Sequence, residues 1–544
     1  MIGVNDPARG FPPPPPPRGY LCLVLHAHLP FVRHPETNYM MEENWLYEAV
    51  TETYIPLLAY FDNLANDAIP FRMTMAITPP LCAMLSDELL RERYANHINK
   101  LIDLAGKEVR RTRYDKAMNR SARMYLERFS LCQYIFEEKY GRDIVSGFKK
   151  LQDAGFLEII TCAATHGYLP NMQSNANAVR AQIEIAVQSY NNFFGRRPRG
   201  IWLPECGYYR GLERFIGDSG IRYLFTETHG LLNADPPPHS GVYAPVRCKE
   251  APVAAFARDA ECSRSVWSAD EGYPGDPHYR EFHKDIGYDL EMPYIAPYID
   301  PAGIRVHTGI KYHRVTNKHD PNKQLYEREN ALRRASVHAS DFINKRAEQI
   351  NRIADAINRP PIVVAPYDAE LFGHWWFEGP EWLNFLIRKC ALEQGAFRLI
   401  TPSEYLDMHP ENHTCAPAFS SWGDGGYSQV WLDEANEWIY PHLHRLEDRM
   451  VECAREFCNT GSGLGRRTLN QMARELLLAQ SSDWAFIMKT GTTVEYATRR
   501  VKEHIASFLK LYEQLKAREV DEDFVALLES HNNIFPDIDF RVYC

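Results

Sequence analysis

The feature that most constrains this fold is a series of short apolar segments, each ending in polar or acidic residues. Their lengths are typical of buried parallel strands, and helical patterns such as 179–194 and 327–358 lie between them. Strands that alternate with helices predict an α/β fold, with a parallel sheet covered by helices. The segments are 21–28, 71–78, 157–165, 200–205, 223–228, 362–368 and 398–401.

A series of about seven or eight such strands favours a closed α/β barrel over an open doubly wound sheet. The first segment is not followed by a Gly-x-Gly-x-x-Gly pattern, so nothing indicates a dinucleotide site. Barrels of this kind place their active sites at the C-terminal ends of the strands. We therefore expect the polar residues that end these segments to meet in one site.

The chain divides into three parts by pattern. Residues 1–18 include a polyproline run and predict a disordered or extended tail. Residues 19–410 hold the strands, with a helical insertion at about 80–155. The strands are expected to stop near Pro410, and an α-helical C-terminal domain is expected at 411–544.

Charge and composition exclude several classes of function. A formal net charge of −10 argues against nonspecific nucleic-acid binding. No apolar run is long enough for a membrane span, and the first residues lack the apolar core of a signal peptide. The 12 cysteines show no metal-binding spacing, and reduced thiols in a cytoplasmic protein are the simplest interpretation.

Two carboxylates end apolar segments in notable surroundings. Glu205 closes 200–205 and Asp368 closes 362–368. Two acids on one barrel rim suit a retaining glycosidase, which needs them about 5–5.5 Å apart. The aromatic neighbourhood of Asp368 would raise its pKa and makes it the better general acid. The plainer alternatives are an exposed strand-end glutamate and a helix N-cap aspartate.

Three histidines also end predicted strands. His26 and His28 are two residues apart, so their imidazoles point the same way. From the residues alone, a metal site and a sugar-binding site are about equally favoured, with purely structural histidines third. His166 has a strand-capping role as its plain alternative.

Four further residues lie outside the apolar segments. Trp267, Trp422 and Trp431 occur in loop-like sequence, where stacking on a sugar competes with ordinary packing. Asp483 interrupts a helical stretch, either as a helix cap or as a side chain that reaches the cleft.

Taken together, these segments resemble glycoside hydrolase family 57, and within it the branching enzymes. The resemblance covers nearly the whole chain after Gly19. The matching segments are HAHLPF at 26–31, ATHGYLP at 164–170, WLPECGYY at 202–209, THGLL at 228–232, SVWSADEGYPGDPHYREFHKDIGYDL at 265–290, APYDAELFGHWWFEGPEWL at 365–383, SSWGDGGYSQVWL at 420–432 and AQSSDWAFIM at 479–488.

The resemblance implies an incomplete (β/α)7 TIM-like barrel with a helical insertion and a helical C-terminal domain beside the cleft. It implies double displacement without metal or cofactor, with Glu205 as nucleophile and Asp368 as general acid/base. The expected substrate-binding residues are His26, His28, His166, Trp202, Tyr243, Arg258, Trp267, Trp422, Trp431 and Asp483.

The implied reaction cuts an α-1,4-glucan and transfers the chain to a 6-hydroxyl, so donor and acceptor glucans are the expected partners of a monomeric enzyme. Such transfer requires that water be kept from the intermediate. The resemblance to branching enzymes implies that a tyrosine on a mobile loop does this. Tyr243, in 231–246, is the first candidate and Tyr273 the second. If neither reaches the cleft, hydrolysis is expected instead.

Three rival functions stay open from the sequence. The first is a hydrolase or 4-α-glucanotransferase of the same family, which would use the same acids. The second is a metal-dependent deacetylase or hydrolase, with His26 and His28 as ligands. The third is a glycan-binding protein without catalysis.

Overall fold

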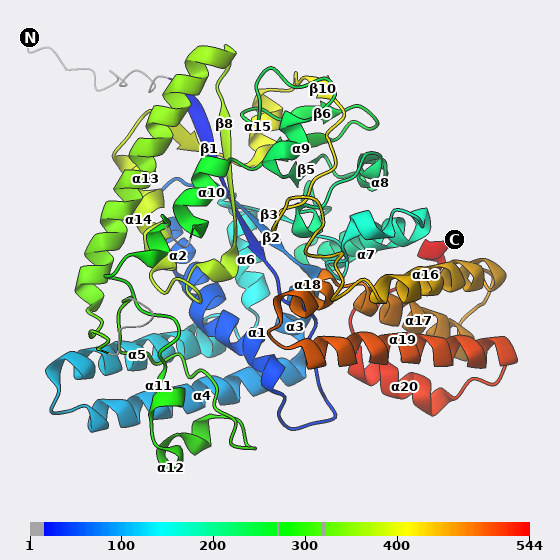
Figure 1. The fold of residues 1–544 in the computed structure, drawn as a ribbon, viewed down its shortest axis with the longest axis horizontal. Helices are drawn as coiled ribbons and strands as arrows, with labels where there is room; N and C mark the ends of the chain where they lie inside the picture. The colour runs from blue at the N-terminus through cyan, green and yellow to red at the C-terminus, as the bar shows by residue number, and fades with distance from the viewer. Residues whose placement is uncertain (1–15, 269–270, 317–321) are drawn as a thin grey trace, which may run out of the picture.

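The computed structural model describes residues 16–268, 271–316 and 322–544 (Figure 1). Within these residues the strands form two five-stranded sheets. The first sheet has the order β3-β2-β1-β8, all parallel, and β9 pairs with the start of β1. Its strands are β1 (Gly19–Ala27), β2 (Met73–Ile77), β3 (Leu157–Ile160), β8 (Ile362–Asp368) and β9 (Phe397–Leu399).

The second sheet has the order β10-β6-β7-β5-β4. Strands β4, β5 and β7 are parallel, whereas β6 runs antiparallel to β7. A parallel bridge from Thr161 to Ile201 and a 2.9 Å hydrogen bond from Asp259 N–H to the Val364 carbonyl link the two sheets. The strands are β4 (Gly200–Ile201), β5 (Tyr223–Thr226), β6 (Val246–Cys248), β7 (Ala254–Ala257) and β10 (Thr414–Cys415).

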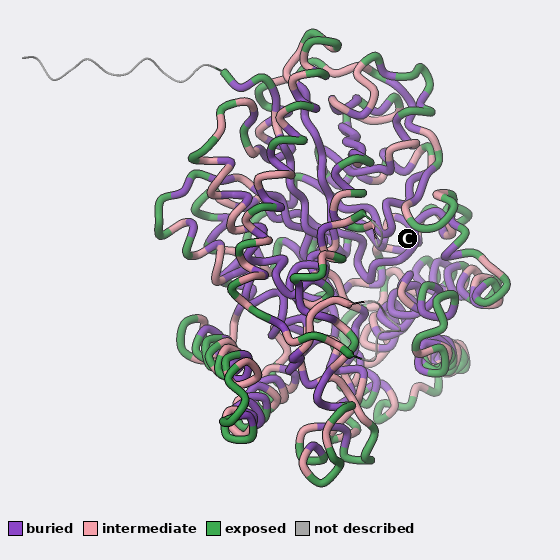
Figure 2. The backbone as a smooth tube through the Cα atoms, turned by 60° about the vertical axis from the view of Figure 1, so that its left-hand side comes forward, coloured by how far each residue is buried: buried purple, intermediate pink, exposed green. Residues whose placement is uncertain are grey.

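The strands form because their side chains are apolar on both faces. In β1, every residue from Leu21 to Leu25 is fully buried. Parallel strands covered on both sides by other elements require this continuous hydrophobicity. Figure 2 shows buried backbone gathered at the centre of the molecule, with exposed segments around its outside.

Helices occupy the connection between β2 and β3. The long helices α4 and α5 lie side by side as a hairpin (Figure 1). Each begins at an aspartate, Asp87 or Asp115, whose side chain accepts hydrogen bonds from the first turn, as good N-caps do. The helices of this connection are α3 (Pro79–Ser86), α4 (Glu88–Arg111), α5 (Lys116–Tyr134) and α6 (Ile144–Asp153).

The remaining helices precede the C-terminal helices in the chain. The longest, α13, packs against α14 and β1. They are α1 (Asn44–Ala49), α2 (Ile55–Asn66), α7 (Ala176–Phe194), α8 (Leu212–Asp218), α9 (Thr228–Leu232), α10 (Ala260–Trp267), α11 (Ile286–Asp289), α12 (Met292–Ile295), α13 (Arg328–Ile357), α14 (Gly379–Leu392) and α15 (Pro402–Met408).

The last part of the chain is helical and packs beside the strand ends (Figure 1). Helices α17 and α19 make the main contact, around a buried hydrogen bond of 2.6 Å between His504 Nδ1 and Glu475. These helices are α16 (Ile439–Glu456), α17 (Leu464–Ala479), α18 (Ser482–Thr490), α19 (Val494–Ala517) and α20 (Glu522–His531). Across the described residues, every helix is too short or too polar to cross a bilayer.

The structure corrects the expected strands in two places. Strands β6 and β7 were missed, because both are short and the alanines of Ala254–Ala257 have weak strand preference. The strands also do not stop at Pro410, because β10 pairs with β6, and Tyr208 and Ser420 form a further bridge. Most of the predicted tail, residues 1–15, lies outside the described residues.

Candidate active site

The candidate site lies where the C-terminal ends of several strands meet helix α18. Strands β1 and β8 are neighbours in register, and His26 is the direct partner of Asp368. Ser481, just before α18, forms an antiparallel bridge with Gly167 after β3. Residues far apart in the sequence therefore converge here, from both sheets and from the C-terminal helices.

Glu205 is held in an unusual backbone conformation in the short 3-10 helix Pro204–Cys206, which follows β4. Its φ of 61° lies in the left-handed region, which costs about 1 kcal/mol or more for a residue other than glycine. Two hydrogen bonds fix its carboxylate: Trp422 Nε1–H donates to Oε2 at 2.7 Å, and the Ser482 hydroxyl donates to Oε1 at 2.7 Å. The Trp422 backbone N–H also donates to the Glu205 carbonyl, at 2.8 Å.

Burial of Glu205 raises its pKa to about 7. The hydrogen bonds from Trp422 and Ser482 work against this rise, because they stabilise the ionised form. The Glu205 carboxyl therefore changes between its protonated and ionised forms near neutral pH.

Asp368 ends β8 in different surroundings. Burial raises its pKa well above the usual range, and the negative charges of Glu370 and Glu205 raise it further, against the opposing charge of Arg258. Glu205 is thus near enough to Asp368 for their charges to interact. Arg258 follows β7 and pairs with Glu227 at 3.2 Å. These surroundings favour the protonated form of Asp368.

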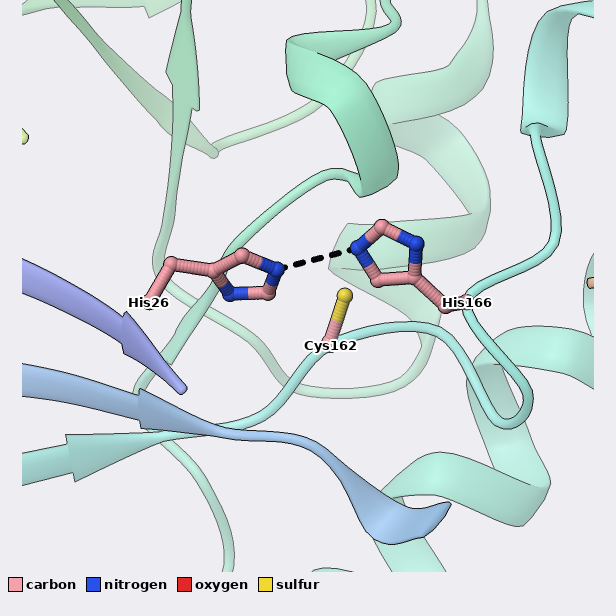
Figure 3. A group of neighbouring side chains, drawn as sticks. All are labelled: His26, Cys162 and His166. Atoms are coloured by element: carbon pink, nitrogen blue, oxygen red, sulfur yellow. Dashed lines mark hydrogen bonds between the residues drawn. The ribbon is translucent and has the colours of Figure 1, made fainter. Parts of the chain in front are cut away.

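A chain of hydrogen bonds runs from His26 through His166 and Ser482 to Glu205, and Figure 3 shows its first bond, between the two imidazoles. Ser482 has one hydroxyl proton, which it donates to Glu205, so it accepts from His166 Nδ1–H at 2.7 Å. His166 Nε2 then lacks a proton and accepts from His26 Nε2–H at 3.0 Å. We assign these tautomers from the hydrogen-bond network. Burial, with the neighbouring imidazoles, lowers the pKa of His26 and of His166 well below the usual value, so both rings are neutral.

His28 differs from the other two histidines. Its Nε2 lies 3.0 Å from Asp483 Oδ2, and its Nδ1 lies 3.0 Å from the Thr78 hydroxyl. Burial lowers the pKa of His28, but Asp483, together with the charges of Glu205 and Glu370, outweighs burial and leaves the pKa raised. Burial in turn raises the pKa of Asp483, whereas His28 lowers it, to a net value of about 2. Helix α18 therefore supplies a charged partner to the strand end of β1.

Two predicted sugar contacts are buried instead. Trp202 has no exposed surface and stacks on His26, with ring centroids 5.1 Å apart. Trp431 is 1% exposed and stacks on Tyr168, also at 5.1 Å. This burial contradicts direct contact of either indole with a sugar, and both rings instead support polar neighbours. Trp422 is partly buried beside Glu205, and Trp267 is 40% exposed at the end of α10.

Neither candidate loop tyrosine lies in the site, so both predictions are wrong for this structure. The Tyr243 carbonyl accepts from Ile362 N–H, at the start of β8 and thus at the opposite end from Asp368. Tyr273 is 7% exposed, and its hydroxyl donates to Asp341 on α13 at 2.7 Å. Both phenol rings pack into the core.

Three polar residues of the site were missed in the sequence. Ser482 adjoins Asp483, and its place in the polar run before Trp484 was the available signal. Glu227 follows β5 as Glu205 follows β4, so the strand-end rule already pointed to it. Glu370 lies two residues after Asp368 and accepts from the His28 backbone N–H at 3.2 Å.

Two groups of side chains have the composition of a metal site. They are His26, Cys162 and His166 (Figure 3), and His28, His166 and Asp483, with ligand atoms within 4.8 Å of one another in each group. In the first group, the hydrogen bond between the two imidazoles engages both Nε2 atoms. An ion at either place would therefore replace part of the chain that ends at Glu205. Absence of a metal stays a prediction.

Paired strand-end acids beside imidazoles and indoles define the class of enzymes that cleave glycosidic bonds with two carboxylates. The comparison with known families agrees with this class. The family model for glycosyl hydrolase family 57 matches residues 22–416, and the model for the C-terminal part of 1,4-alpha-glucan branching enzymes matches residues 442–543. The chain belongs to glycosyl hydrolase family 57.

Solved structures of relatives align over almost the whole chain. The structure described as the novel alpha-amylase AmyC from Thermotoga maritima is 47% identical, covers 97% of this chain and 99% of its own, and has a TM-score of 0.91. A family 57 branching enzyme from Thermococcus kodakaraensis, solved with glucose, is 33% identical over 97% of this chain and 96% of its own, with a TM-score of 0.86. A branching enzyme from Pyrococcus horikoshii is 34% identical over 97% of each chain, also with a TM-score of 0.86.

Proposed function

We propose that this protein is a retaining 1,4-α-glucan branching enzyme, with Glu205 as nucleophile and Asp368 as general acid/base. The observation that carries the proposal is the contrast in the surroundings of two buried acids: Trp422 and Ser482 donate hydrogen bonds to the Glu205 carboxylate, whereas Asp368 faces the negative charges of Glu370 and Glu205. A carboxylate beside a carboxylic acid is the pairing that double displacement needs. The branching enzymes among the relatives, and the match of residues 442–543, support the choice of reaction.

In the first half of the proposed reaction, the Glu205 carboxylate attacks the anomeric carbon of an α-1,4-linked glucose. Asp368 gives its proton to the leaving oxygen, and a covalent glycosyl-enzyme forms. In the second half, Asp368 removes a proton from a 6-hydroxyl of an acceptor glucan. That oxygen attacks the anomeric carbon, releases Glu205 and leaves an α-1,6 branch.

The surrounding side chains have proposed roles around this pair. His26, His28 and His166 hold hydroxyls of the sugar at the cleavage point, and Asp483 keeps His28 charged. Trp422 donates a hydrogen bond to Glu205, and the positive charge of Arg258 acts on Asp368. Trp267 offers an exposed ring for stacking on a sugar. Trp202 and Trp431, which the sequence predicted to bind sugar, instead support the rings that they stack on, His26 and Tyr168.

The finer architecture is also a proposal. We infer that the parallel strands, in the order β8-β1-β2-β3-β4-β5-β7, form the incomplete (β/α)7 barrel implied by the family, with the two inter-sheet contacts at Thr161 and Asp259 closing it. Residues 19–410 and 411–544 remain the proposed domains, with the second sheet extending through Ser420. A cytoplasmic monomer acting in glycogen-type synthesis stays a prediction.

The test is incubation of the full chain with amylose, followed by proton NMR of the product. New α-1,6 signals at constant or slowly rising reducing ends are the expected result. Reducing ends without α-1,6 signals would overturn branching. Chains redistributed in length, again without α-1,6 signals, would indicate a 4-α-glucanotransferase.

An α-amylase-like hydrolase is the second candidate, and two observations favour it. The relative at 47% identity is described as an alpha-amylase, and neither Tyr243 nor Tyr273 lies in the site to keep water out. Hydrolysis and branching share the glycosyl-enzyme and differ only in which hydroxyl attacks it. The ratio of α-1,6 linkages to reducing ends in the same experiment therefore measures both.

A further inference from the structure

An aromatic pair, an exposed Trp375 and a half-buried Phe282, lies near Asp368 in the chain and has no role in the chemistry described above. The Trp375 side chain is 56% exposed and stacks on Phe282, with ring centroids 4.5 Å apart and an angle of 28° between the planes. The Trp375 backbone N–H donates to the Glu370 carbonyl at 3.2 Å. Glu370 is two residues from Asp368, a span of at most about 7 Å. The pair therefore lies on the same rim as the catalytic acids.

The segment that carries Trp375 is anchored by a π-helical turn, Val50–Tyr54, between α1 and α2. Glu52 of this turn lies 2.7 Å from His374 Nδ1, and the Tyr54 hydroxyl donates to Glu370. Single π-helical turns inside helices are frequent at functional sites. One turn thus holds the Trp375 segment at both ends.

Close packing fixes the same segment further. Gly373 has a φ of 116°, and a Cβ at this position would collide with the Glu52 carbonyl oxygen. Only glycine allows the segment to lie this close to the π-helical turn. The backbone before Trp375 is therefore set before any ligand arrives.

Phe282 is supported from its inner side. The Lys311 ammonium lies over the Phe282 ring, 4.2 Å from its centroid, and Lys311 is 1% exposed. Lys311 is therefore the buried contact of the ring, and Trp375 is its exposed contact. The buried Lys311 ammonium supports the Phe282 ring, and the fixed backbone before Trp375 supports the indole. The indole is therefore the outward surface of this stack.

We propose that Trp375, supported by Phe282, is a binding platform for the part of an α-glucan chain that extends beyond the sugars at Glu205 and Asp368. This inference rests on the proposed function and names a further contact of the same substrate. A flat apolar ring suits the apolar face of a pyranose, and a neutral glucan needs no charged partner on the platform. Because the stack is pre-organised, little freedom is lost when a chain binds.

The test compares long and short substrates with the full chain carrying Trp375→Ala. The KM for amylose is expected to rise about tenfold, which corresponds to roughly 1.4 kcal/mol, while kcat stays within about twofold. Activity on a maltooligosaccharide too short to reach the platform is expected to stay unchanged. Trp375→Phe keeps a flat ring and is expected to recover most of the affinity. Tyr114→Ala is the matched control, since Tyr114 is 86% exposed between α4 and α5.

Direct binding separates this inference from the proposed function. Amylose affinity is measured for Asp368→Asn and for the same variant with Trp375→Ala, both without turnover. Weaker binding in the double variant supports the platform, whatever reaction the acids perform. Equal binding in the two variants overturns it. Loss of a dimer on Trp375→Ala, seen by size-exclusion chromatography, also overturns it, because the indole would then face a second copy of the chain.

Discussion

The surroundings of Glu205 and of Asp368 differ more than their burial does. The Glu205 carboxylate accepts hydrogen bonds from Trp422 and Ser482, which favour its ionised form. In the part of the chain that the structure describes, no side chain donates to Asp368, and Glu370 adds a second negative charge nearby. Two similar acids are therefore held in different surroundings: donors stabilise the ionised form of Glu205, and nearby negative charge favours the protonated form of Asp368.

This difference teaches that donors, and not depth alone, assign the roles of a carboxylate pair. Burial raises the pKa of both acids, but only Glu205 has two donors aimed at its oxygens. The neutral histidines contribute indirectly, because His166 leaves the Ser482 proton free to point at Glu205. We expect the difference between the roles of Glu205 and Asp368 to be lost when either acid, or a donor to Glu205, is changed.

The largest effect is expected from removing either acid. Glu205→Gln and Asp368→Asn should each lower kcat/KM on amylose by at least about 10³-fold with an unchanged fold. The two acids act together, so the loss of either one removes most of the catalysis. A donor with a good leaving group needs no proton, so it should restore much of the first step in Asp368→Asn but none in Glu205→Gln. Circular dichroism controls for folding. Near-normal turnover of either variant would refute the assignment.

A smaller effect is expected from removing one donor to Glu205. Activity needs Glu205 ionised, so it should fall as the pH falls through about 7, and it should fall again at high pH as Asp368 loses its proton. Ser482→Ala removes a donor that favours the carboxylate, so the acidic limb should move up by about 1 pH unit. The pH profile of kcat/KM measures this shift. Ser482→Thr retains a hydroxyl and should retain the limb, whereas an unmoved limb in Ser482→Ala would argue against the hydrogen-bond account.

The smallest effect is expected from metal removal. If the Glu205 end works through hydrogen bonds from His26, His166 and Ser482, then exhaustive chelation should leave turnover within about twofold of the untreated enzyme, a change of roughly 0.4 kcal/mol. Elemental analysis of the treated protein is the control. Loss of activity that returns when Zn²⁺ is added would instead assign His26, Cys162 and His166, or His28 and Asp483, to an ion.

Much of the site was predictable because local patterns encode it. An apolar run that ends in an acid places that acid at a strand end, and this held for Asp368 at the end of β8. The spacing of His26 and His28 placed two imidazoles at the end of β1. The tyrosine prediction failed because residues 231–246 have no periodic pattern from which the path of their backbone could be predicted. Its backbone instead hydrogen-bonds to the start of β8.

The sequence alone determined the alternation of strands and helices, the residues that end each strand, and the resemblance to family 57. These depend on hydrophobic period and local spacing, which a chain carries wherever it folds. Only the tertiary structure decided that Ser482 of α18 faces Glu205, that Trp202 stacks on His26, and that Trp375 stacks on Phe282. Such contacts join segments far apart in the sequence, so they follow from packing and not from any neighbouring residues.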